Sequence, residues 1–184
     1  MNPPTKGHEI LISGMLELAK LGNAAHILYL SHSQNNLTDP LAFTLKRRIV
    51  TAAFPDVKVS NSKVILNPFD ALRQLSTEYE DIVFLVGSDR VEEFTKNMPQ
   101  YAAKWGVKNF AVMSGGHRDP DAKDATGMSA SKLRTLAKAS KQREFCKGLP
   151  NQLNSVMKTQ VYQYTIKGLE NARSRNITVK RAKR

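Results

Sequence analysis

The chain has 184 residues, which is enough for one well-buried core and too few for two comfortable domains. Its content of 41% hydrophobic and 7% aromatic residues is typical of a globular protein, and no apolar run approaches the roughly 20 residues of a membrane-spanning helix. The single cysteine, Cys146, excludes an internal disulfide framework. We therefore expect a cytoplasmic protein with an idle thiol, no signal peptide and no membrane partner.

The net charge of +12 is concentrated toward the C-terminus. From Lys167 to Arg184, seven Lys and Arg residues stand against Glu170 alone, so this basic tail supplies half of the total. A basic protein suits phosphate ligands, and it also suits nucleic acid through counterion release. No zinc-ligand spacing or recognition-helix pattern accompanies the charge. We expect a disordered, solvated tail, with nucleic-acid binding as the alternative.

Helices and strands are expected to alternate along the chain. Residues 8–21 predict a helix, because apolar residues recur at helical spacing until Gly22. Residues 26–31 (HILYLS) predict a short buried strand. Asp39-Pro40, a capping side chain followed by proline, predicts the start of the next helix.

The segment that follows gives weaker signals. Residues 57–59 and 64–66 are candidate strands, and Asn67-Pro68 repeats the signal of a cap followed by proline for a helix through Leu75.

The central and C-terminal segments give clearer signals. Residues 81–86 (DIVFLV) form the clearest strand of the sequence, and residues 110–113 predict another. Residues 114–127 are rich in Gly, Asp and Pro and predict a loop, and residues 129–172 predict a helical region. This order favours an α/β fold, a Rossmann-like parallel sheet with helices on both faces, in which ligands sit beyond the carboxyl ends of the strands.

The first motif, Thr5-Lys6-Gly7-His8, directly precedes a predicted helix. A helix N-terminus attracts phosphate, Gly7 would allow a close backbone approach, and His8 could donate a proton to a phosphate oxygen. The alternative is a threonine cap followed by a surface histidine, because short motifs often occur by chance.

The second motif, Met128-Ser-Ala-Ser-Lys-Leu-Arg134, lies where a loop meets a helix. The hydroxyls of Ser129 and Ser131, with Lys132 and Arg134 behind them, could cradle a triphosphate. A plain serine cap with solvated charges explains the pattern equally well.

The third motif, Val86-Gly-Ser-Asp-Arg90, follows the clearest strand. Gly87 would open the edge of the sheet to a nucleotide, and Asp89 could hold a ribose hydroxyl or cap the next helix. Arg90 could reach a phosphate or lie in solvent. All three motifs fall at strand-to-helix turns, which share one edge in a parallel sheet.

Together, T-K-G-H, G-S-D and M-S-A-S-K-L-R resemble the nucleotidyltransferase superfamily, whose motifs are H/T-x-G-H and I-S-S-T-x-x-R. The resemblance spans about residues 2–150, including Asn2-Pro3-Pro4. The chain as a whole is similar to phage-encoded members related to nicotinamide-mononucleotide adenylyltransferases and cytidylyltransferases. It implies a domain at 1–150, followed by a C-terminal helix and basic tail at 151–184.

The resemblance also implies the chemistry. The phosphate of a small acceptor attacks the α-phosphorus of a nucleoside triphosphate in the presence of Mg²⁺, and pyrophosphate leaves. It implies catalytic roles for His8, Thr5 and Arg134. It implies binding of the nucleotide and its phosphates by seven residues: Gly7, Lys46, Gly87, Asp89, Ser129, Ser131 and Lys132.

Several polar residues keep two explanations. Lys46 matches a basic position that the family uses for phosphate, although a solvated helix face explains Lys46, Arg47 and Arg48 as well. His26 is expected to pack beside a strand, and His32 to contact the acceptor or lie in solvent. Arg118, Asp119, Asp121 and Asp124 could shape a lid or assist Mg²⁺, but an exposed loop is the simpler explanation. No protein-held metal site is expected.

One feature departs from the family. Its first strand, a central one, normally stands just before the N-P-P segment, whereas this sequence begins at Met1. We expect the first strand to be missing or truncated, and a misassigned start codon is favoured over replacement by another strand or loss of catalysis. An exposed sheet edge would favour a homo-oligomer.

The favoured function is adenylyl transfer from ATP to nicotinamide mononucleotide, slightly ahead of cytidylyl transfer from CTP. The alternatives are a catalytically inactive phage protein, structural or nucleic-acid-binding, that retains the fold, and a regulatory nucleotide binder. A phage protein would act in the cytoplasm of its host.

Overall fold

The computed structural model describes residues 1–35, 37–116 and 127–181, with side chains through Glu170. Two compact units are each assembled from separate stretches of chain. The first unit comprises Met1–Glu9, His32–Asp56 and Pro120–Arg184, and the second comprises Ile10–Ser31 and Val57–Asp119. The division between them passes through α1 (Lys6–Leu21), which begins two residues earlier than predicted.

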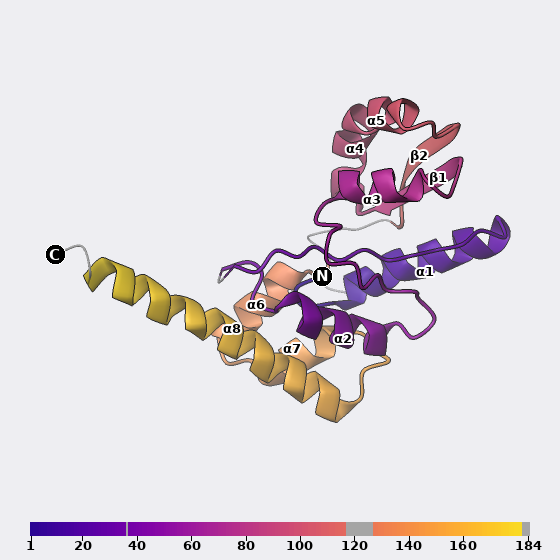
Figure 1. The fold of residues 1–184 in the computed structure, drawn as a ribbon. Helices are drawn as coiled ribbons and strands as arrows, with labels where there is room; N and C mark the ends of the chain where they lie inside the picture. The colour runs from indigo at the N-terminus through magenta and orange to yellow at the C-terminus, as the bar shows by residue number, and fades with distance from the viewer. Residues whose placement is uncertain (36, 117–126, 182–184) are drawn as a thin grey trace. The chain divides into compact units, whose positions relative to one another are not determined.

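The second unit contains a parallel βαβ arrangement. Strand β1 (Asp81–Val86) pairs in parallel with β2 (Asn109–Ser114), and the two lie side by side in Figure 1. The connection between them holds the 3₁₀ helix η1 (Ser88–Arg90), α4 (Val91–Asn97) and α5 (Pro99–Lys104). The strands predicted at 81–86 and 110–113 are therefore confirmed, and the protein mixes helices with a two-stranded parallel sheet.

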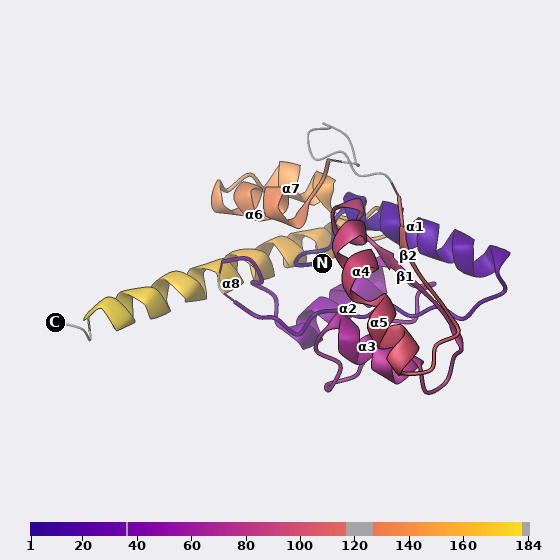
Figure 2. The ribbon, with the colours of Figure 1, turned by 90° about the horizontal axis from the view of Figure 1, so that it is seen from above.

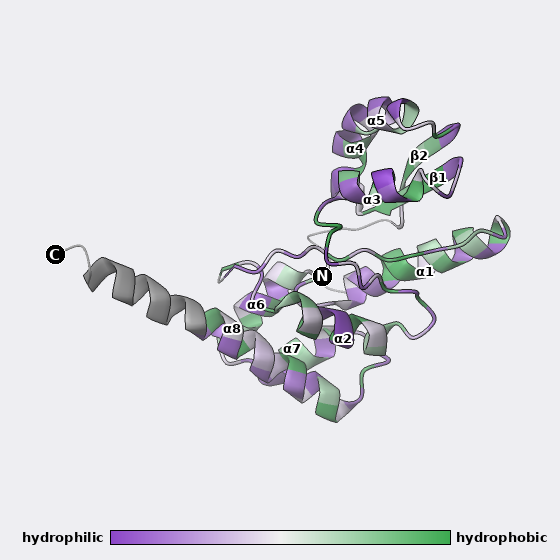
Figure 3. Ribbon diagram, in the orientation of Figure 1, coloured by the Kyte–Doolittle hydropathy of each residue, from purple (hydrophilic) through white to green (hydrophobic). Residues whose placement is uncertain are grey.

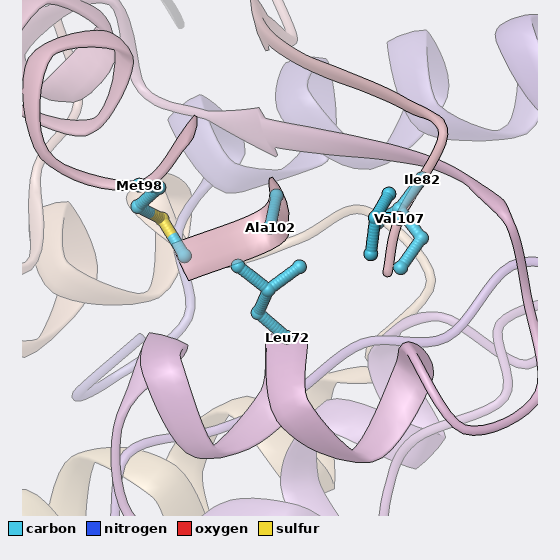
Figure 4. Packing of buried hydrophobic residues seen from close by; sticks show 5 residues of the cluster. All are labelled: Leu72, Ile82, Met98, Ala102 and Val107. Carbon is cyan, nitrogen blue, oxygen red and sulfur yellow. The ribbon is translucent and has the colours of Figure 1, made fainter. Parts of the chain in front are cut away.

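A compact apolar cluster holds this unit together. Helix α3 (Pro68–Leu75) and α5 pack against the sheet through buried side chains that Figure 4 draws together. These are Leu72, Ile82, Met98, Ala102 and Val107. The rings of Phe84 and Phe110 meet edge to face on neighbouring strands and border the cluster.

The start of α3 confirms a local sequence signal. The Asn67 side chain accepts hydrogen bonds from the backbone N–H groups of Phe69 and Asp70, and the Asp70 carboxylate accepts from the Asn67 N–H in return. This reciprocal capping satisfies amide groups that the helix itself leaves unpaired.

Three predicted strands are not formed. Residues 26–31 and 57–59 meet only at a parallel bridge between Leu28 and Val59, closed by two backbone hydrogen bonds of 2.9 Å. Residues 64–66 form no strand, and Val64 is 78% exposed. One bridge supplies too few hydrogen bonds to extend into a ladder.

The first unit holds α2 (Phe43–Ala53), which begins later than the Asp39-Pro40 signal predicted. The Asp39 carboxylate does not cap the helix, because it accepts hydrogen bonds from the side chains of Asn35 and Thr38 in the preceding turn. The residue at the cap position is Ala42, which makes no side-chain cap.

The predicted C-terminal helical region is present as three helices: α6 (Ala130–Lys138), α7 (Gln142–Gly148) and α8 (Ser155–Arg181). They lie beside one another in Figures 1 and 2. Figure 3 shows hydrophobic and hydrophilic residues on each, as one-sided burial requires. The tail, predicted to be disordered, continues as helical backbone to Arg181, so that prediction is wrong there.

The loop predicted at 114–127 lies mostly outside the described residues, as do His117, Arg118, Asp119, Asp121 and Asp124. Among the helices that the structure describes, none combines the length with the apolar character that crossing a membrane would require.

The core of the second unit yields a stability prediction. Leu72→Ala removes a fully buried side chain and is expected to lower the free energy of unfolding by about 2–5 kcal/mol, measured by urea denaturation. The matched control is Leu66→Ala, because Leu66 is 56% exposed and its truncation should cost little. Equal losses from the two substitutions would contradict the core described above.

Candidate functional site

The N-terminal motif folds into a small hydrogen-bonded group around Thr5, which is wholly buried. The Thr5 backbone N–H donates to Nδ1 of His8 at 3.1 Å. A backbone amide can only donate, so Nδ1 is an acceptor and the hydrogen of a neutral His8 ring lies on Nε2. The Thr5 hydroxyl has two acceptors within reach, the Met128 carbonyl at 3.0 Å and Nδ1 of His8 at 2.8 Å.

The contact with Met128 brings the second motif to the first. Ser129 caps α6 as predicted, and its Oγ accepts from the Lys132 N–H at 3.1 Å. Ser131 and Lys132 are exposed in the first turn of α6. The positive end of a nine-residue helix therefore lies next to the Thr5–His8 segment.

Two cations of the first unit are buried to different extents, Lys46 fully and Arg134 in part. Lys46 is completely buried, and burial lowers its pKa, an effect that the nearby charge of Asp39 partly opposes. Burial lowers the pKa of Arg134 in the same way, again opposed by Asp39. The charge of Asp39 thus acts on both cations.

The burial of Lys46 corrects one of the two explanations given for it, because it does not lie on a solvated face. That explanation does hold for Arg48, which is exposed and lies with its guanidinium carbon 6.0 Å from the centre of the Tyr164 ring.

Sequence reasoning missed two residues of this group. Asn2 is 4% exposed, and its side chain donates to Asp39 Oδ1 at 3.3 Å. Its backbone carbonyl accepts from Nη1 of Arg134 at 2.9 Å. Asn2 was noticed only as part of the N-P-P segment, and Asp39 was interpreted as a helix cap, so neither carried a signal for this role.

The third motif belongs to the second unit. Gly87 precedes η1, and a side chain there would meet the Asp89 carboxylate, because a Cβ would lie 2.5 Å from Oδ1. Asp89 makes no cap on the following helix, and exposed Arg90 lies 3.6 Å from Glu93.

The remaining predicted residues take ordinary positions. Gly7 is partly buried in the first turn of α1, and His26 is partly buried. The His32 ring stacks on Phe43 with a centroid separation of 3.7 Å and an interplanar angle of 16°. In the described parts of the chain, no three His, Cys, Asp or Glu residues are grouped so that they could hold a metal ion.

The charge of the protein divides unevenly between its units. The first unit contains 19 Lys and Arg against 7 Asp and Glu, a balance of +12. The second contains 9 of each kind and is neutral. The entire net charge therefore belongs to the unit that holds Lys46, Arg134 and the start of α6.

Comparison with protein-family models, curated proteins and solved structures finds no match to this chain.

The burial of Lys46 yields a prediction for stability. Between its lowered folded pKa and its unfolded value near 10.5, the unfolded chain binds more protons, so wild-type stability should gain from Lys46 as the pH rises through this window. The free energy of unfolding of Lys46→Met is expected to lie within about 1 kcal/mol of the wild-type value at neutral pH, or above it. The variant should lack the increase in stability with pH that Lys46 provides.

Urea denaturation at about pH 7 and about pH 10 tests this expectation. The control is Lys20→Met, because Lys20 is exposed near the end of α1 and its replacement should leave the pH dependence of stability unchanged. A loss of several kcal/mol in Lys46→Met at neutral pH would mean that Lys46 holds the fold together.

Proposed function

We propose that the protein is a nucleotidyltransferase and that the first unit binds the phosphates of its nucleotide. The observation that carries the proposal is the gathering of buried Lys46 and partly buried Arg134 near Asp39, with Arg134 and Asp39 both hydrogen-bonded to Asn2. Burying a cation costs free energy unless an anion compensates for it. A bound polyphosphate would bring negative charge to these two cations.

The neighbouring groups fit the same ligand. Ser129 caps α6 and Ser131 lies in its first turn, where helix amides favour phosphate oxygens. In this proposal Lys132 adds charge at the rim of the site, and Gly7 allows the backbone of α1 to come close to the ligand.

In the proposed reaction, an oxygen of the acceptor phosphate forms a bond to the α-phosphorus. The bond from the α-phosphorus to the bridging oxygen breaks in line, and its electron pair leaves with pyrophosphate. His8 donates Nε2–H to the α-phosphate as charge develops, and Thr5 holds the His8 ring through the bond to Nδ1. Arg134 stabilises the departing pyrophosphate, and Lys46 contributes through its charge, because its side chain is completely buried.

Magnesium fits this site as the companion of the triphosphate. Mg²⁺ usually binds substrate phosphates with one or two carboxylates, and Asp39 is the carboxylate present here, already engaged by Asn2, Asn35 and Thr38. When bound, the ion would neutralise charge on the phosphates.

We also propose that the two parallel pairings of the second unit, β1 with β2 and Leu28 with Val59, belong to a Rossmann-like sheet. Gly87 and Asp89 follow β1, at the carboxyl end of this strand, where such sheets bind their ligands. ATP with nicotinamide mononucleotide remains the favoured substrate pair, ahead of CTP, on the family resemblance alone, with the reaction in the cytoplasm.

The activity is tested by pyrophosphate release with Mg²⁺, across ATP and CTP and a panel of phosphorylated acceptors. His8→Ala is expected to lower the rate about 100-fold or more, because it removes a donor to the charge that develops on the phosphate. His26→Ala is the matched control, since His26 lies in the second unit and has no assigned role. If wild type releases no pyrophosphate in response to any acceptor, the proposal is refuted.

A second candidate, nucleic-acid binding, is favoured by the confinement of the whole net charge to the first unit. Deleting residues 173–184 removes six Lys and Arg residues and no acidic residue, so any DNA affinity should fall and its salt dependence should flatten. Titration of labelled DNA at several salt concentrations measures both. A full-length variant with glutamine at these six positions separates charge from chain length, and unchanged affinity in both variants would reject this candidate.

A further inference from the structure

Asn2 ties the N-terminal segment to the residues that precede α2. Its side-chain amide makes a reciprocal pair of hydrogen bonds with the Leu41 backbone: the Leu41 N–H donates to Oδ1 at 3.0 Å, and Nδ2 donates to the Leu41 carbonyl at 3.3 Å. Nδ2 also reaches Asp39 Oδ1 at 3.3 Å. Because Asn2 is almost fully buried, water has little access to replace these hydrogen bonds if they break.

The same residue receives Arg134. Nη1 of Arg134 donates to the Asn2 backbone carbonyl at 2.9 Å, across 132 residues of sequence. A guanidinium is planar and presents its donors in a rigid fork, so one bond at this length restricts the orientation of the whole group. The position of that carbonyl depends in turn on the two hydrogen bonds between the Asn2 side chain and the Leu41 backbone.

We propose that Asn2 is a positioning residue of the anion site. It orients the guanidinium of Arg134, and through Leu41 and Asp39 it fixes the start of the segment that carries Lys46. The assignment of an anion to this site rests on the proposed function, whereas the control of Arg134 by Asn2 can be measured without any ligand.

The first experiment measures the freedom of Arg134 in the full-length protein. Phenylglyoxal modifies accessible arginine side chains, and mass spectrometry follows the rate at Arg134. Asn2→Ala should raise this rate several-fold, because the carbonyl that holds the guanidinium is no longer anchored. Asn67→Ala is the matched control: it removes an asparagine that caps α3 in the second unit and should leave the rate unchanged. An unchanged rate in Asn2→Ala overturns the proposal.

The second experiment is a double-mutant cycle on the binding of inorganic pyrophosphate, measured by calorimetry. If Asn2 acts through Arg134, each single substitution to alanine should weaken binding by about tenfold or more, and the double variant should be little weaker than Arg134→Ala alone. If the fold-loss of affinity in the double variant equals the product of the two single losses, the two residues act independently and the proposal is overturned.

The two experiments separate this inference from the proposed function. A raised modification rate without pyrophosphate binding in wild type would support positioning by Asn2 and reject the phosphate site. If Asn2→Ala does not fold, Asn2→Ser serves in both experiments, because its shorter hydroxyl cannot make both bonds to Leu41. Asn2→Ser is then expected to raise the rate of modification at Arg134 and to weaken pyrophosphate binding without adding to the effect of Arg134→Ala.

Discussion

The buried N-terminal segment is the constraint on which the candidate site depends. Asn2 and Thr5 are polar and almost inaccessible to water, so their groups require partners inside the protein. Asn2 finds them at Leu41 and Arg134, and Thr5 finds one at Met128. Residues separated by 39 to 132 positions in the sequence are thereby drawn to one segment.

This arrangement explains why Arg134 and buried Lys46 lie near the same carboxylate. The hydrogen bonds of Asn2 fix Arg134 and the segment before α2 against the N-terminus, and Lys46 follows one turn into α2. Asp39 moderates the cost of both cations, yet its carboxylate is shared with neutral donors from Asn35 and Thr38. A ligand with several negative charges would gain more from such a site than a single carboxylate would.

The sequence predicted those features whose causes are local. The strand at β1 follows from a continuous apolar run, and the start of α3 follows from Asn67 and Pro68 within one turn. The strand expected at 26–31 has the same apolar character as β1, but a strand also needs a neighbour that pairs along its length, as β2 does with β1 from Asp81 to Val86. The neighbour of residues 26–31 supplies a single bridge at Val59.

Side-chain roles set by distant partners escaped prediction for the same reason. Asp39 has the residue type and the following proline of a helix cap, but its carboxylate is engaged by Asn35 and Thr38 and by Asn2, 37 residues away. Lys46 has neighbours typical of a solvated face, and its burial follows from how the unit packs. The sequence does group the residues on either side of the contact between Thr5 and Met128, because each side is a short continuous motif. Thr5 and His8 belong to the first motif, and Ser129 and Arg134 belong to the second.

The hydrogen bonds of Thr5 also distinguish the part that His8 can take from that of the two cations. A doubly protonated ring would turn a hydrogen on Nδ1 toward the Thr5 amide hydrogen, so this contact favours neutral His8. The ring then offers a directed N–H through Nε2 and adds no fixed charge, while Lys46 and Arg134 carry the charge of the site. Because the Thr5 hydroxyl can donate to Nδ1 or to the Met128 carbonyl, but not to both at once, the hydrogen bonding of His8 is coupled to the start of α6. A phosphate held at the N-terminus of α6 would therefore influence, through one hydroxyl, the side chain placed to stabilise its reaction.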